Sequence, residues 1–573
     1  MKMNKKDVIG FLETIATYLE IKGDNPFKIS AYRKAALALE SDERTLEEID
    51  NPASLNGIGK GTAEVILELK QTGACSLLTQ LQEEVPSGLL PLLKLPGLGG
   101  KKIGKLYKEL NVVCINTLKQ MCEEKRVQQL AGFGKKTEEK ILLAIEEAST
   151  RPERLALPLV LPIAQSIEHA LMEMDGVQRF SRAGSLRRLR ETVKDLDFII
   201  ATTEPEKVKA GLLDLEDISK VIASGDTKVS VEITGEFPIS VDFRLVLPEE
   251  FATTLHHFTG SKDHNVKMRQ LAKKRGERIS EYGVEDLETG EVKTFDTEEE
   301  FFAHFNLAFI PAEAREDQGE VEKADETSSL QVYVSDQQIR SDLHMHTTWS
   351  DGAHSIEEMV EAARAKGYEY IAITDHSKYL RVANGLSVER LKEQHAKIRT
   401  LNEKYEDFTI LTGIEMDILP DGTLDYDDDV LAEVDFVIAA IHSSFQQDRD
   451  MIMKRLRTAL ESKHVDLIAH PTGRLLGRRE GYDVDVEMLI QLAKETNTAL
   501  ELNANPHRLD LSAHWLKKAE EAGVVISVNT DAHNKESLDL MSYGTSAARK
   551  AMLHPDSIIN TWSLDKLQAF LKR

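Results

Sequence analysis

Apolar residues spaced three and four positions apart dominate the first 150 residues and predict helices over 7–21, 29–40 and 61–70. Within this region one pattern recurs, at 54–66, 94–107 and 129–142. Each copy has an apolar residue, a Gly-x-Gly turn, small or basic residues and an amphipathic helix. Copies spaced about 40 and 35 residues apart indicate repeated supersecondary units.

After residue 150 the pattern mixes strands and helices. Short β-rich runs predict strands over 196–201, 228–233 and 239–246, and apolar periodicity predicts a helix over 161–174. Residues 311–340 are polar and acidic with little periodicity, which predicts a linker.

From residue 341 apolar strand-like runs alternate with amphipathic helical stretches. Counting SDLHMH at 341–346 as the first, the sequence predicts seven strands. Strand and helix in turn are typical of parallel β/α architecture, here a small barrel.

Composition sets limits on the function. The chain has 573 residues and a formal net charge of −25, which taken whole argues against nucleic-acid binding. Residues 1–150 nevertheless carry 21 basic and 21 acidic side chains, whereas residues 341–573 carry 27 and 39 and hold 12 of the 17 histidines. Acid together with histidine is the composition of a metal site.

Targeting signals are not evident. No run reaches the roughly 18 apolar residues that span a bilayer, and the N-terminus lacks the features of a signal peptide. Three scattered cysteines do not make a disulfide framework. We therefore expect a cytoplasmic protein.

The three Gly-x-Gly copies have a binding chemistry of their own. A glycine turn that opens a helix presents free backbone N–H groups at the positive end of the helix dipole, where they can hold phosphate without reading a base. A plain packing motif is the alternative, but three copies with basic flanks favour DNA binding. These segments resemble helix-hairpin-helix motifs. The candidate DNA-binding residues are Gly57, Gly59, Lys60, Gly97, Gly99, Lys101, Lys102, Gly132, Gly134, Lys135 and Lys136.

Acids on strands of the central region predict a two-metal site. Asp195 and Asp197 alternate along one strand and face the same way, and Asp242 lies in another strand-like run. Three carboxylates on adjacent strands can bind two magnesium ions about 4 Å apart. Gly184 and Ser185, followed by Arg187 and Arg188, can grip triphosphate oxygens.

The order GS-x-RR, DLD, VDF and then HFTGSKDHNVKMR at 257–269 resembles the family X DNA polymerases, the group of DNA polymerase beta. The resemblance implies that Asp195, Asp197 and Asp242 are catalytic metal ligands. It implies a nucleotide site formed by Gly184, Ser185, Arg188, Phe258, Gly260, Asn265 and Arg269. FKISAYRKAA at 27–36 resembles the small N-terminal domain of that family, which implies that Lys28 and Tyr32 lie near a 5′-phosphate.

Two positions depart from that family. Val65 follows Ala63-Glu64 where family lyases carry their Schiff-base lysine, which argues against lyase chemistry by that lysine, although Lys60 is near. His257 stands where an aromatic Tyr-Phe pair is common, so we expect discrimination between deoxyribose and ribose to differ.

In the last region, clusters of polar residues lie at the ends of six of the predicted strands. The ends of parallel strands in a β/α barrel meet in one place, so these clusters predict a single site. Imidazole mixed with carboxylate suits zinc, manganese or iron. Metal ions bound in such a cluster lower the pKa of a bound water, which can then attack a phosphate ester. The candidate ligands are His344, His346, Asp351, His376, Glu415, His442, His470, Asp531 and His533, enough for two or three ions.

This region resembles the polymerase-and-histidinol-phosphatase (PHP) superfamily, which implies a distorted seven-stranded barrel and a trinuclear metal site. All nine ligand positions of that pattern are filled. Arg474 and Arg508 could hold substrate phosphates. The order of the three regions resembles bacterial PolX-type polymerases, which implies gap filling plus a metal-dependent 3′→5′ exonuclease. Some relatives also cleave abasic sites or remove 3′-blocking groups.

The expected fold is multidomain: a helical hairpin region over 1–90 and 91–150, a nucleotidyltransferase-type α+β palm and thumb over 151–310, an acidic linker over 311–340 and a (β/α)7 barrel over 341–573. The main hypothesis is a monomeric DNA repair enzyme acting on gapped or nicked DNA with deoxynucleoside triphosphates. It would use Mg²⁺ or Mn²⁺ in the polymerase site and Mn²⁺ or Zn²⁺ in the barrel. The alternatives are a histidinol-phosphatase-like enzyme of small metabolites and a non-catalytic DNA scaffold.

Overall fold

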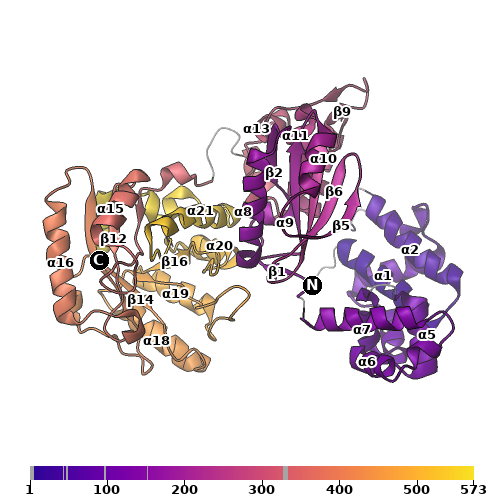
Figure 1. The fold of residues 1–573 in the computed structure, drawn as a ribbon, viewed down its shortest axis with the longest axis horizontal. Coiled ribbons are helices and arrows are strands. Elements are labelled where there is room, and N and C mark those ends of the chain that lie inside the picture. Colours follow the sequence, from indigo (N-terminus) through magenta and orange to yellow (C-terminus); the bar gives the residue numbers. More distant parts are fainter. Residues whose placement is uncertain are drawn as a thin grey trace. The chain divides into compact units, whose positions relative to one another are not determined.

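The computed structural model describes residues 5–572, apart from 43, 45, 47–48, 96–97, 151 and 327–332. The chain divides into two compact units, Met1–Glu153 and Arg154–Arg573 (Figure 1). We call the first the N-terminal unit. The second contains a central module, residues 154–326, and a barrel, residues 333–572.

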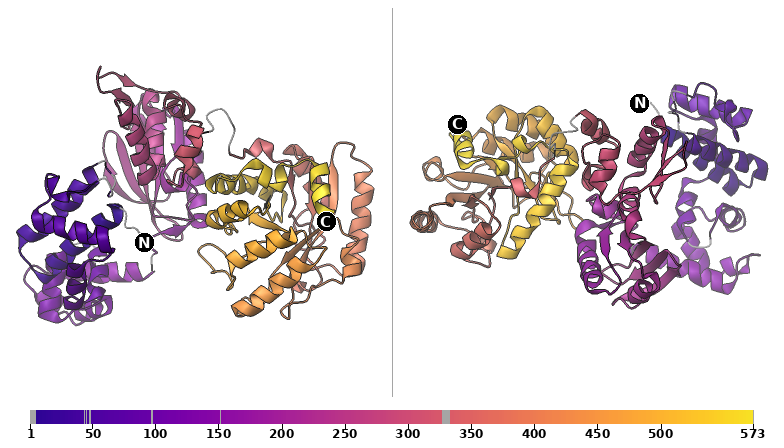
Figure 2. Two further views of the ribbon diagram at one scale, coloured as in Figure 1. Left: turned by 180° about the vertical axis from the view of Figure 1, so that it is seen from behind. Right: turned by 90° about the horizontal axis from the view of Figure 1, so that it is seen from above.

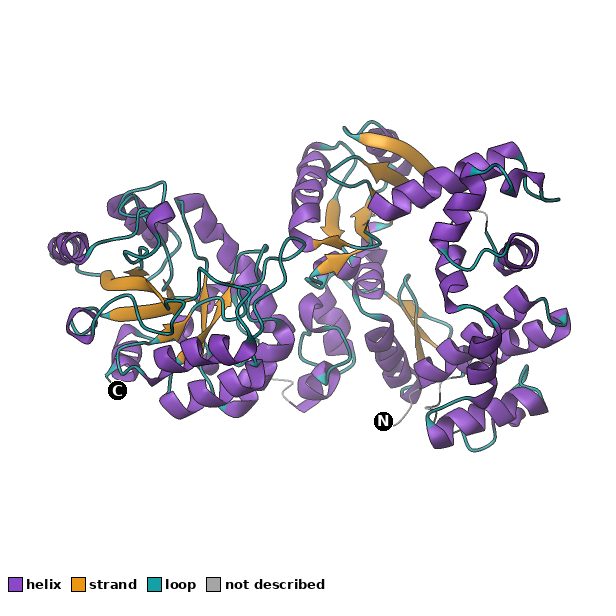
Figure 3. Cartoon of the chain, turned by 90° about the horizontal axis from the view of Figure 1, so that it is seen from below, coloured by secondary structure: helices purple, strands orange, loops and turns teal. Residues whose placement is uncertain are grey.

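The regular secondary structure described in the N-terminal unit is all helical (Figure 3). Its α-helices are α1 (Lys5–Lys22), α2 (Pro26–Ser41), α3 (Lys60–Thr72), α4 (Ser76–Glu84), α5 (Gly100–Leu110), α6 (Ile115–Glu123) and α7 (Lys135–Thr150). Helices α1, α2 and α3 confirm the three helices predicted from periodicity. Asn25 caps α2 by accepting a hydrogen bond from the backbone N–H of Phe27, and Pro26 occupies its first turn.

The three sequence repeats share one local structure. A short 3₁₀ helix precedes each Gly-x-Gly turn, and α3, α5 or α7 follows it; these are η1 (Pro52–Ser54), η2 (Ser87–Lys94) and η3 (Val127–Gln129). The middle residue of each turn, Ile58, Leu98 or Phe133, is buried in the core. The described flanking glycines, Gly57, Gly59, Gly99, Gly132 and Gly134, are exposed.

The central module is built on a five-stranded sheet in the order β2-β4-β7-β6-β5. Strands β4 and β7 are parallel, and the other neighbours are antiparallel. The strands are β2 (Arg179–Arg182), β4 (Asp195–Ala201), β5 (Ile218–Ser224), β6 (Lys228–Ile233) and β7 (Ile239–Val246), with β1 (Leu155–Ala156) and β3 (Thr192–Val193) paired separately. Helix α8 (Leu157–Glu173) packs on the sheet through Leu161 and Ile167, which share a core with Phe198 and Phe243. The strands predicted over 196–201, 228–233 and 239–246 are confirmed.

The rest of the central module is a smaller α/β part with its own core. Helices α9 (Gly184–Arg187) and α10 (Pro205–Leu213) share the core of the five-stranded sheet. The elements that follow the sheet are η4 (Pro248–Glu250), α11 (Phe251–Thr259), α12 (Lys262–Lys274), β8 (Glu277–Ile279), β9 (Val284–Asp286), β10 (Val292–Lys293), α13 (Glu298–His304), η5 (Ala312–Ala314) and α14 (Glu320–Glu326). Strands β10, β9 and β8 form a separate sheet.

The predicted linker over 311–340 is wrong for most of its length. Ala314, Val321 and Ala324 belong to the same core as Phe301 and Phe302. Two charged residues of this stretch are buried with partners outside it: Arg315 forms an ion pair with Glu298, and Glu320 forms a hydrogen bond with Nδ1 of His264 at 2.7 Å. Polar composition resembles a solvated linker because a sequence does not reveal that charges neutralise each other inside a core. Residues 327–332 lie outside the described residues.

Seven parallel strands, adjacent in chain order, form the barrel and confirm the predicted number. They are β11 (Ser341–Asp342), β12 (Tyr370–Ile373), β13 (Thr409–Asp417), β14 (Phe436–Ala440), β15 (Leu467–Ile468), β16 (Ala499–Asn503) and β17 (Ile526–Asn529). A parallel bridge between Met345 and Ala532 links the first and last strands and nearly closes the barrel.

Helices surround these strands (Figure 2). They are α15 (Ile356–Ala365), α16 (Val388–Asn402), α17 (Asp428–Leu431), α18 (Arg449–Glu461), α19 (Val486–Thr496), α20 (Ala513–Ala522), α21 (Met541–Lys550) and α22 (Leu564–Leu571), with 3₁₀ helices η6 (Asp336–Gln338), η7 (Arg381–Ala383), η8 (Lys535–Leu540), η9 (Pro555–Ser557) and η10 (Ile559–Thr561). Among the described residues, none of the helices has the length and apolar content needed to cross a membrane.

Candidate functional site

The sheet of the central module brings the three predicted aspartates together. Asp197 on β4 lies opposite Asp242 on the parallel strand β7, and Asp195 is two residues earlier on the same face as Asp197. All three side chains lie on the less buried face of the sheet. We call this group the acid site.

Mutual repulsion in the acid site favours a cation. Burial, followed by the charges of Asp195 and Asp242, raises the pKa of Asp197 to about 6. Divalent cations remove that penalty, and oxygen-only ligands suit magnesium. The donor set therefore fits the implied metal ions.

Two residues that the sequence interpretation missed contact Asp242. Nζ of Lys228 lies 2.7 Å from its Oδ2, and the hydroxyl of Ser230 donates a hydrogen bond to its Oδ1 at 2.6 Å. Both come from β6, where Ser230 is the direct antiparallel partner of Asp242. The alternation of KVSVEI placed Lys228 and Ser230 on one face, but only the strand order shows that β6 adjoins β7.

The Gly-Ser turn lies directly against the acid site. Gly184 has a φ of 59°, and a Cβ at this position would collide with Oδ2 of Asp197. The backbone N–H of Ala183 donates to the carbonyl of Asp197 at 2.7 Å. Glycine is therefore required both by conformation and by close approach. Ser185 directly follows this contact in the chain.

Arg188 is anchored to the thumb side of the module. Its Nη1 donates to the carbonyl oxygen of Thr259 at 2.7 Å, and its Nε donates to Glu316 at 3.1 Å. Arg187, the other arginine of the motif, contacts the hydroxyl of Thr259 at 2.8 Å and pairs with Glu298. The paired arginines thus join the Gly-Ser turn to the HFTGS segment.

The remaining predicted nucleotide residues cluster around that segment. Nδ2 of Asn265 donates to the carbonyl of His257 at 2.7 Å, and Gly260 leaves no room for a Cβ beside Asn265. The guanidinium of Arg244, which the sequence interpretation missed, stacks 3.8 Å over the ring of Phe258. Arg269 is exposed on α12.

In the N-terminal unit the described hairpin glycines are exposed and lie just before helices α3, α5 and α7. Gly59 and Gly99 cap α3 and α5 without a side-chain hydrogen bond, so the first N–H groups of these helices are not covered by a capping side chain. Gly57 and Gly132 have φ values of 101° and 89°. The described predicted residues of the hairpins are exposed except Lys102, which lies 5.7 Å over the ring of Phe133. Gly97 lies outside the described residues.

The two residues that were expected near a 5′-phosphate, Lys28 and Tyr32, do not line the cavity of the N-terminal unit. Tyr32 is 6% exposed and belongs to the core, and Lys28 pairs with Asp24 at 3.3 Å. A cavity of about 320 Å³ is lined instead by Ser30, Arg33, Lys34 and Lys101, among others. Val65 is buried, so the expected lyase position is a packing position.

In the barrel, Glu415 near the end of β13 is the centre of the histidine cluster. Its Oε2 lies 2.8 Å from Nδ1 of His376 and 3.4 Å from Nε2 of His344. Its Oε1 lies 3.1 Å from Nε2 of His442 and 3.0 Å from Nε2 of His470. Although burial by itself raises the pKa of Glu415, the surrounding imidazoles hold it well below its usual value.

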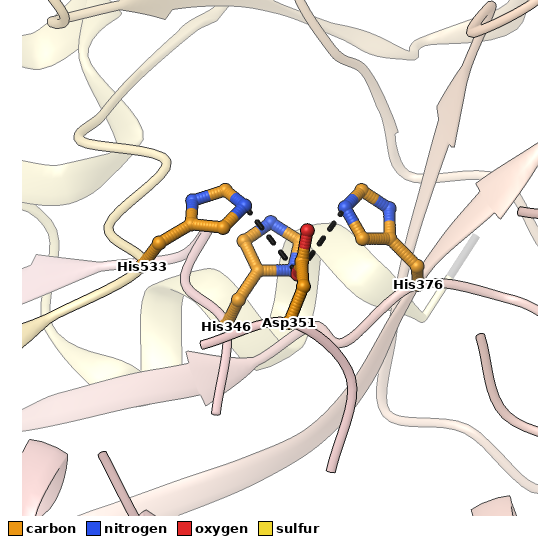
Figure 4. Close-up of side chains that lie close together, drawn as sticks. All are labelled: His346, Asp351, His376 and His533. Atoms are coloured by element: carbon orange, nitrogen blue, oxygen red, sulfur yellow. Dashed lines mark ion pairs between the residues drawn. The ribbon is translucent and has the colours of Figure 1, made fainter. Parts of the chain in front are cut away.

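Asp351 collects a second group of imidazoles (Figure 4). Its Oδ1 lies 3.5 Å from Nε2 of His533 and 3.7 Å from Nε2 of His376. His346 is also in reach, with Nδ1 4.0 Å from the same oxygen and Nε2 3.2 Å from Oδ1 of Asp531. All nine predicted ligands thus lie together, and we call them the histidine site.

The histidine site has the donor chemistry of a metal centre. Three groups have ligand atoms within 4.8 Å of one another: His346, Asp351, His376 and His533; His344, His346 and Asp531; and His376, Glu415 and His442. Within the described residues, Nε2 of His344 and Oε2 of Glu415 are buried and lie near each other and near Nδ1 of His376, but none of these contacts has the geometry of a hydrogen bond. Divalent cations would satisfy both atoms, so the residues fit the implied ions. His470 belongs to none of the three groups and touches the site through Glu415.

Supporting side chains of the histidine site were missed. Glu501 on β16 accepts at Oε2 from the backbone N–H of His470 at 2.7 Å, and its Oε1 lies 2.7 Å from Nδ1 of His344. Asn503 donates to Asp531 at 3.1 Å. These contacts fix the imidazole so that its other nitrogen faces the site. The sequence did contain a signal for them: Glu501 and Asn503 are two residues apart in the otherwise apolar strand ALELN and therefore lie on the same face.

The two arginines proposed for phosphate have different surroundings. Nε of Arg508 lies 3.7 Å from Oδ2 of Asp531, and Arg508 lines a cavity of about 270 Å³ together with Asp531 and His533. Arg474 pairs instead with Glu191 of the central module at 2.8 Å. Arg508 thus borders the histidine site, whereas Arg474 joins the barrel to the central module.

An acid site on a mixed sheet and a histidine site in a seven-stranded barrel together define a polymerase of the DNA polymerase beta type joined to a metal-dependent phosphoesterase. Family comparisons agree. The DNA polymerase beta thumb family matches residues 254–316 and the PHP domain family matches residues 342–505. The helix-hairpin-helix domain and the SAM-like helix-hairpin-helix tandem match residues 3–75 and 89–147.

Individual relatives are more specific. The chain is 62% identical over 571 residues to a DNA polymerase/3′-5′ exonuclease PolX of Bacillus subtilis (strain 168), covering 100% of both chains. It is 30% identical over 242 residues to a probable phosphatase of Thermoanaerobacter sp. (strain X514), covering 40% of this chain and 94% of that protein. The chain therefore belongs to the PolX family, and it is a DNA polymerase with a 3′-5′ exonuclease in its C-terminal barrel.

Proposed function

We propose that the acid site carries gap-filling nucleotidyl transfer and that the histidine site carries 3′→5′ exonuclease activity. The observation that carries this division is the presence of two chemically different donor sets: three carboxylates in one, and in the other eight imidazole and carboxylate ligands with His470 beside Glu415. Oxygen-only ligands favour Mg²⁺ or Mn²⁺ in the acid site, and imidazole-rich ligands favour Mn²⁺ or Zn²⁺ in the barrel.

In the polymerase reaction Asp195, Asp197 and Asp242 would hold the metal ions. Metal ions bound there supply Lewis acidity for the primer 3′-hydroxyl and charge compensation for the transferred phosphoryl group. Lys228 compensates part of the charge of Asp242 from the side. Ser185 and Arg188 bind the triphosphate of the incoming nucleotide, and Phe258 and Gly260 border its sugar.

Asn265 and Arg269 on α12 complete that pocket toward the nascent base pair and the template. In the N-terminal unit the exposed hairpin amides bind backbone phosphates of gapped or nicked DNA without reading sequence. Arg33, Lys34 and Lys101 supply charge for a phosphate at the adjacent cleft.

In the barrel the nine ligands would hold two or three ions, whose chemistry is the activation of water for attack on a phosphodiester. Arg508 neutralises the non-bridging phosphate oxygens beside His533 and Asp531. Glu501 orients His344, and Asn503 orients Asp531. We further propose that the enzyme acts in the cytoplasm as a monomer.

Two variants of the full chain test the division. On a labelled gapped duplex Asp242→Ala is expected to abolish synthesis and retain exonuclease activity, and His344→Ala is expected to do the reverse. Loss of both activities from either change, in protein with an unchanged melting temperature, contradicts the two-site assignment.

A second activity of the barrel is favoured by its similarity to probable phosphatases over 40% of the chain. Removal of a 3′-phosphate from a DNA end needs the same donor set acting on a monoester. A gapped duplex ending in 3′-phosphate tests it, with His344→Ala as control. Histidinol phosphate offered in parallel tests the small-metabolite alternative.

A further inference from the structure

The barrel inserts one lysine into the nucleotide side of the central module. Lys550 is the last residue of α21, and its Nζ donates a hydrogen bond to the carbonyl oxygen of Arg188 at 2.8 Å. The same Nζ lies 3.3 Å from Oε1 of Glu316. The two side chains are 15% and 12% exposed, so water and salt screen this pair weakly.

Glu316 holds the other end of Arg188. It accepts from Nε of Arg188 at 3.1 Å, while Nη1 of Arg188 donates to the carbonyl of Thr259 at 2.7 Å. The guanidinium is fixed by these two partners, and the backbone of the same residue is fixed by Lys550. Arg188 is thus restrained at both ends by groups that lie outside the Gly-Ser turn.

Lys550 also affects the charge that Arg188 can offer to a ligand. Glu316 also lies 3.6 Å from Nη1 of Arg190 and therefore faces three cations. Because Lys550 and Arg190 share its single negative charge, Arg188 keeps net positive charge for another anion. Without Lys550, Glu316 would pair more completely with Arg188 and compete with a phosphate for it.

We propose that Lys550, acting through Glu316, is a positioning residue for nucleotidyl transfer: the exonuclease barrel keeps the guanidinium of Arg188 placed and charged for the triphosphate of the incoming nucleotide. This inference rests on the proposed function, because the role of Arg188 at the triphosphate is part of it. Misplacing a charged donor by a fraction of an ångström weakens binding of the substrate it grips.

The chain offers a matched control. Lys517 on α20 is another barrel lysine that reaches the central module, and its Nζ donates to the carbonyl of Gln318 at 3.3 Å. Lys517 and Lys550 line the same cavity of about 420 Å³. Methionine at either position keeps the aliphatic stem. Lys517→Met removes the hydrogen bond to Gln318, and Lys550→Met removes those to Arg188 and Glu316. Of these two lysines, Lys550 is the one that contacts Arg188 and Glu316, whereas Lys517 contacts Gln318.

The test is steady-state synthesis by the full chain on a gapped duplex with Mg²⁺, alongside exonuclease rates on the same DNA. Lys550→Met is expected to raise KM for the nucleotide by about 3–20-fold with a smaller change in kcat, since it perturbs a charge-assisted contact. Exonuclease rates should stay within about twofold, and Lys517→Met should leave both activities within about twofold.

A double-mutant cycle tests the route through Glu316. In a Glu316→Gln background the effect of Lys550→Met should shrink, because the charge that Lys550 balances is gone. Lys550→Arg should restore most of the wild-type KM. If Lys550→Met does not fold, two other variants test the proposal. Lys550→Arg should keep KM near the wild-type value, and Glu316→Gln should raise KM because the guanidinium of Arg188 loses one of its two partners.

Three results overturn the proposal: an unchanged KM in folded Lys550→Met, an equal effect with and without Glu316, or a parallel fall of synthesis, exonuclease rate and melting temperature. Asp242→Ala separates this failure from that of the proposed function. If Asp242→Ala retains synthesis, the acid-site assignment fails; if it loses synthesis while Lys550→Met behaves as wild type, only the role of Lys550 fails.

Discussion

The acid site and the histidine site solve the same problem, holding cations against phosphate, with opposite designs. The acid site has three carboxylates on two neighbouring strands, and its side chains face the more open side of a sheet. The histidine site draws its ligands from the ends of six strand regions, and most of these side chains are buried. An open carboxylate site suits ions that arrive with a substrate, whereas a buried imidazole site suits ions that stay.

The largest expected effect comes from the centre of the histidine site. Glu415→Gln removes the carboxylate shared by His344, His376, His442 and His470. We expect exonuclease activity to fall by at least about 1000-fold, with bound metal reduced, because metal-activated water is lost. Metal analysis by mass spectrometry and exonuclease assays on the same preparation check this.

The control for that change is Glu403→Gln, at an exposed position of the same barrel. It should leave metal content and both activities at wild-type values. Retention of full metal content and exonuclease activity by Glu415→Gln would show that the cluster is held by other groups.

Metal removal should separate the two sites kinetically. After dialysis against a chelator and return to excess Mg²⁺, synthesis should recover at once, because the acid site binds oxygen-preferring ions reversibly. Exonuclease activity should need Mn²⁺ or Zn²⁺, and the melting temperature of the depleted protein should drop by several degrees, since bound ions stabilise the folded state. Equal recovery of both activities in Mg²⁺ would remove the contrast between the sites.

A smaller effect is expected from changing Glu501, which contacts the imidazole of His344. Glu501→Gln keeps the shape of the side chain but weakens its hold on His344. Exonuclease activity should fall by about 10–100-fold, as for other residues that orient a metal ligand. Its metal titration midpoint should shift to higher concentration. Synthesis measured in the same protein is the internal control, and an unaltered midpoint would contradict the orienting role.

The smallest effect concerns the pH dependence of the thumb. Although burial alone raises the pKa of Glu298, the guanidinium groups of Arg315 and Arg187 lower it to about 2, from an ordinary value of 4.5. The folded state therefore binds this proton more weakly than the unfolded state. The stabilisation is complete above pH 4.5 and is lost as the pH falls toward 2.

Glu298→Gln should accordingly lower stability near neutral pH and flatten its decline below pH 4.5. Denaturant unfolding followed at several pH values measures this. An exposed acid of the same helix, Glu299, provides the control as Glu299→Gln. An identical acid profile in wild type and Glu298→Gln would show that this ion pair does not contribute.

The sequence alone predicted the strands and most of the site residues that they carry. The strands that carry Asp197, Asp242 and Glu415 were predicted because apolar alternation and polar strand ends are local signals. The contacts of Lys228 with Asp242 and of Glu501 with His344 were missed because they depend on which strands are neighbours. The linker prediction failed at Arg315 and Glu320, because a buried acid or base with a partner inside a core looks the same in sequence as one in solvent.

The hydrogen bond between Lys550 and Arg188 joins residues 362 positions apart. A ribosome that has just completed the Gly-Ser turn must still add nearly two thirds of the chain before this bond can form. At about 5–20 residues per second, that interval lasts roughly 20–70 s. The strands of the central sheet end at Val246, so all of them are synthesised before the lysine partner of Arg188 exists. Translation order therefore couples the completion of the nucleotide pocket to the completion of the barrel that removes nucleotides.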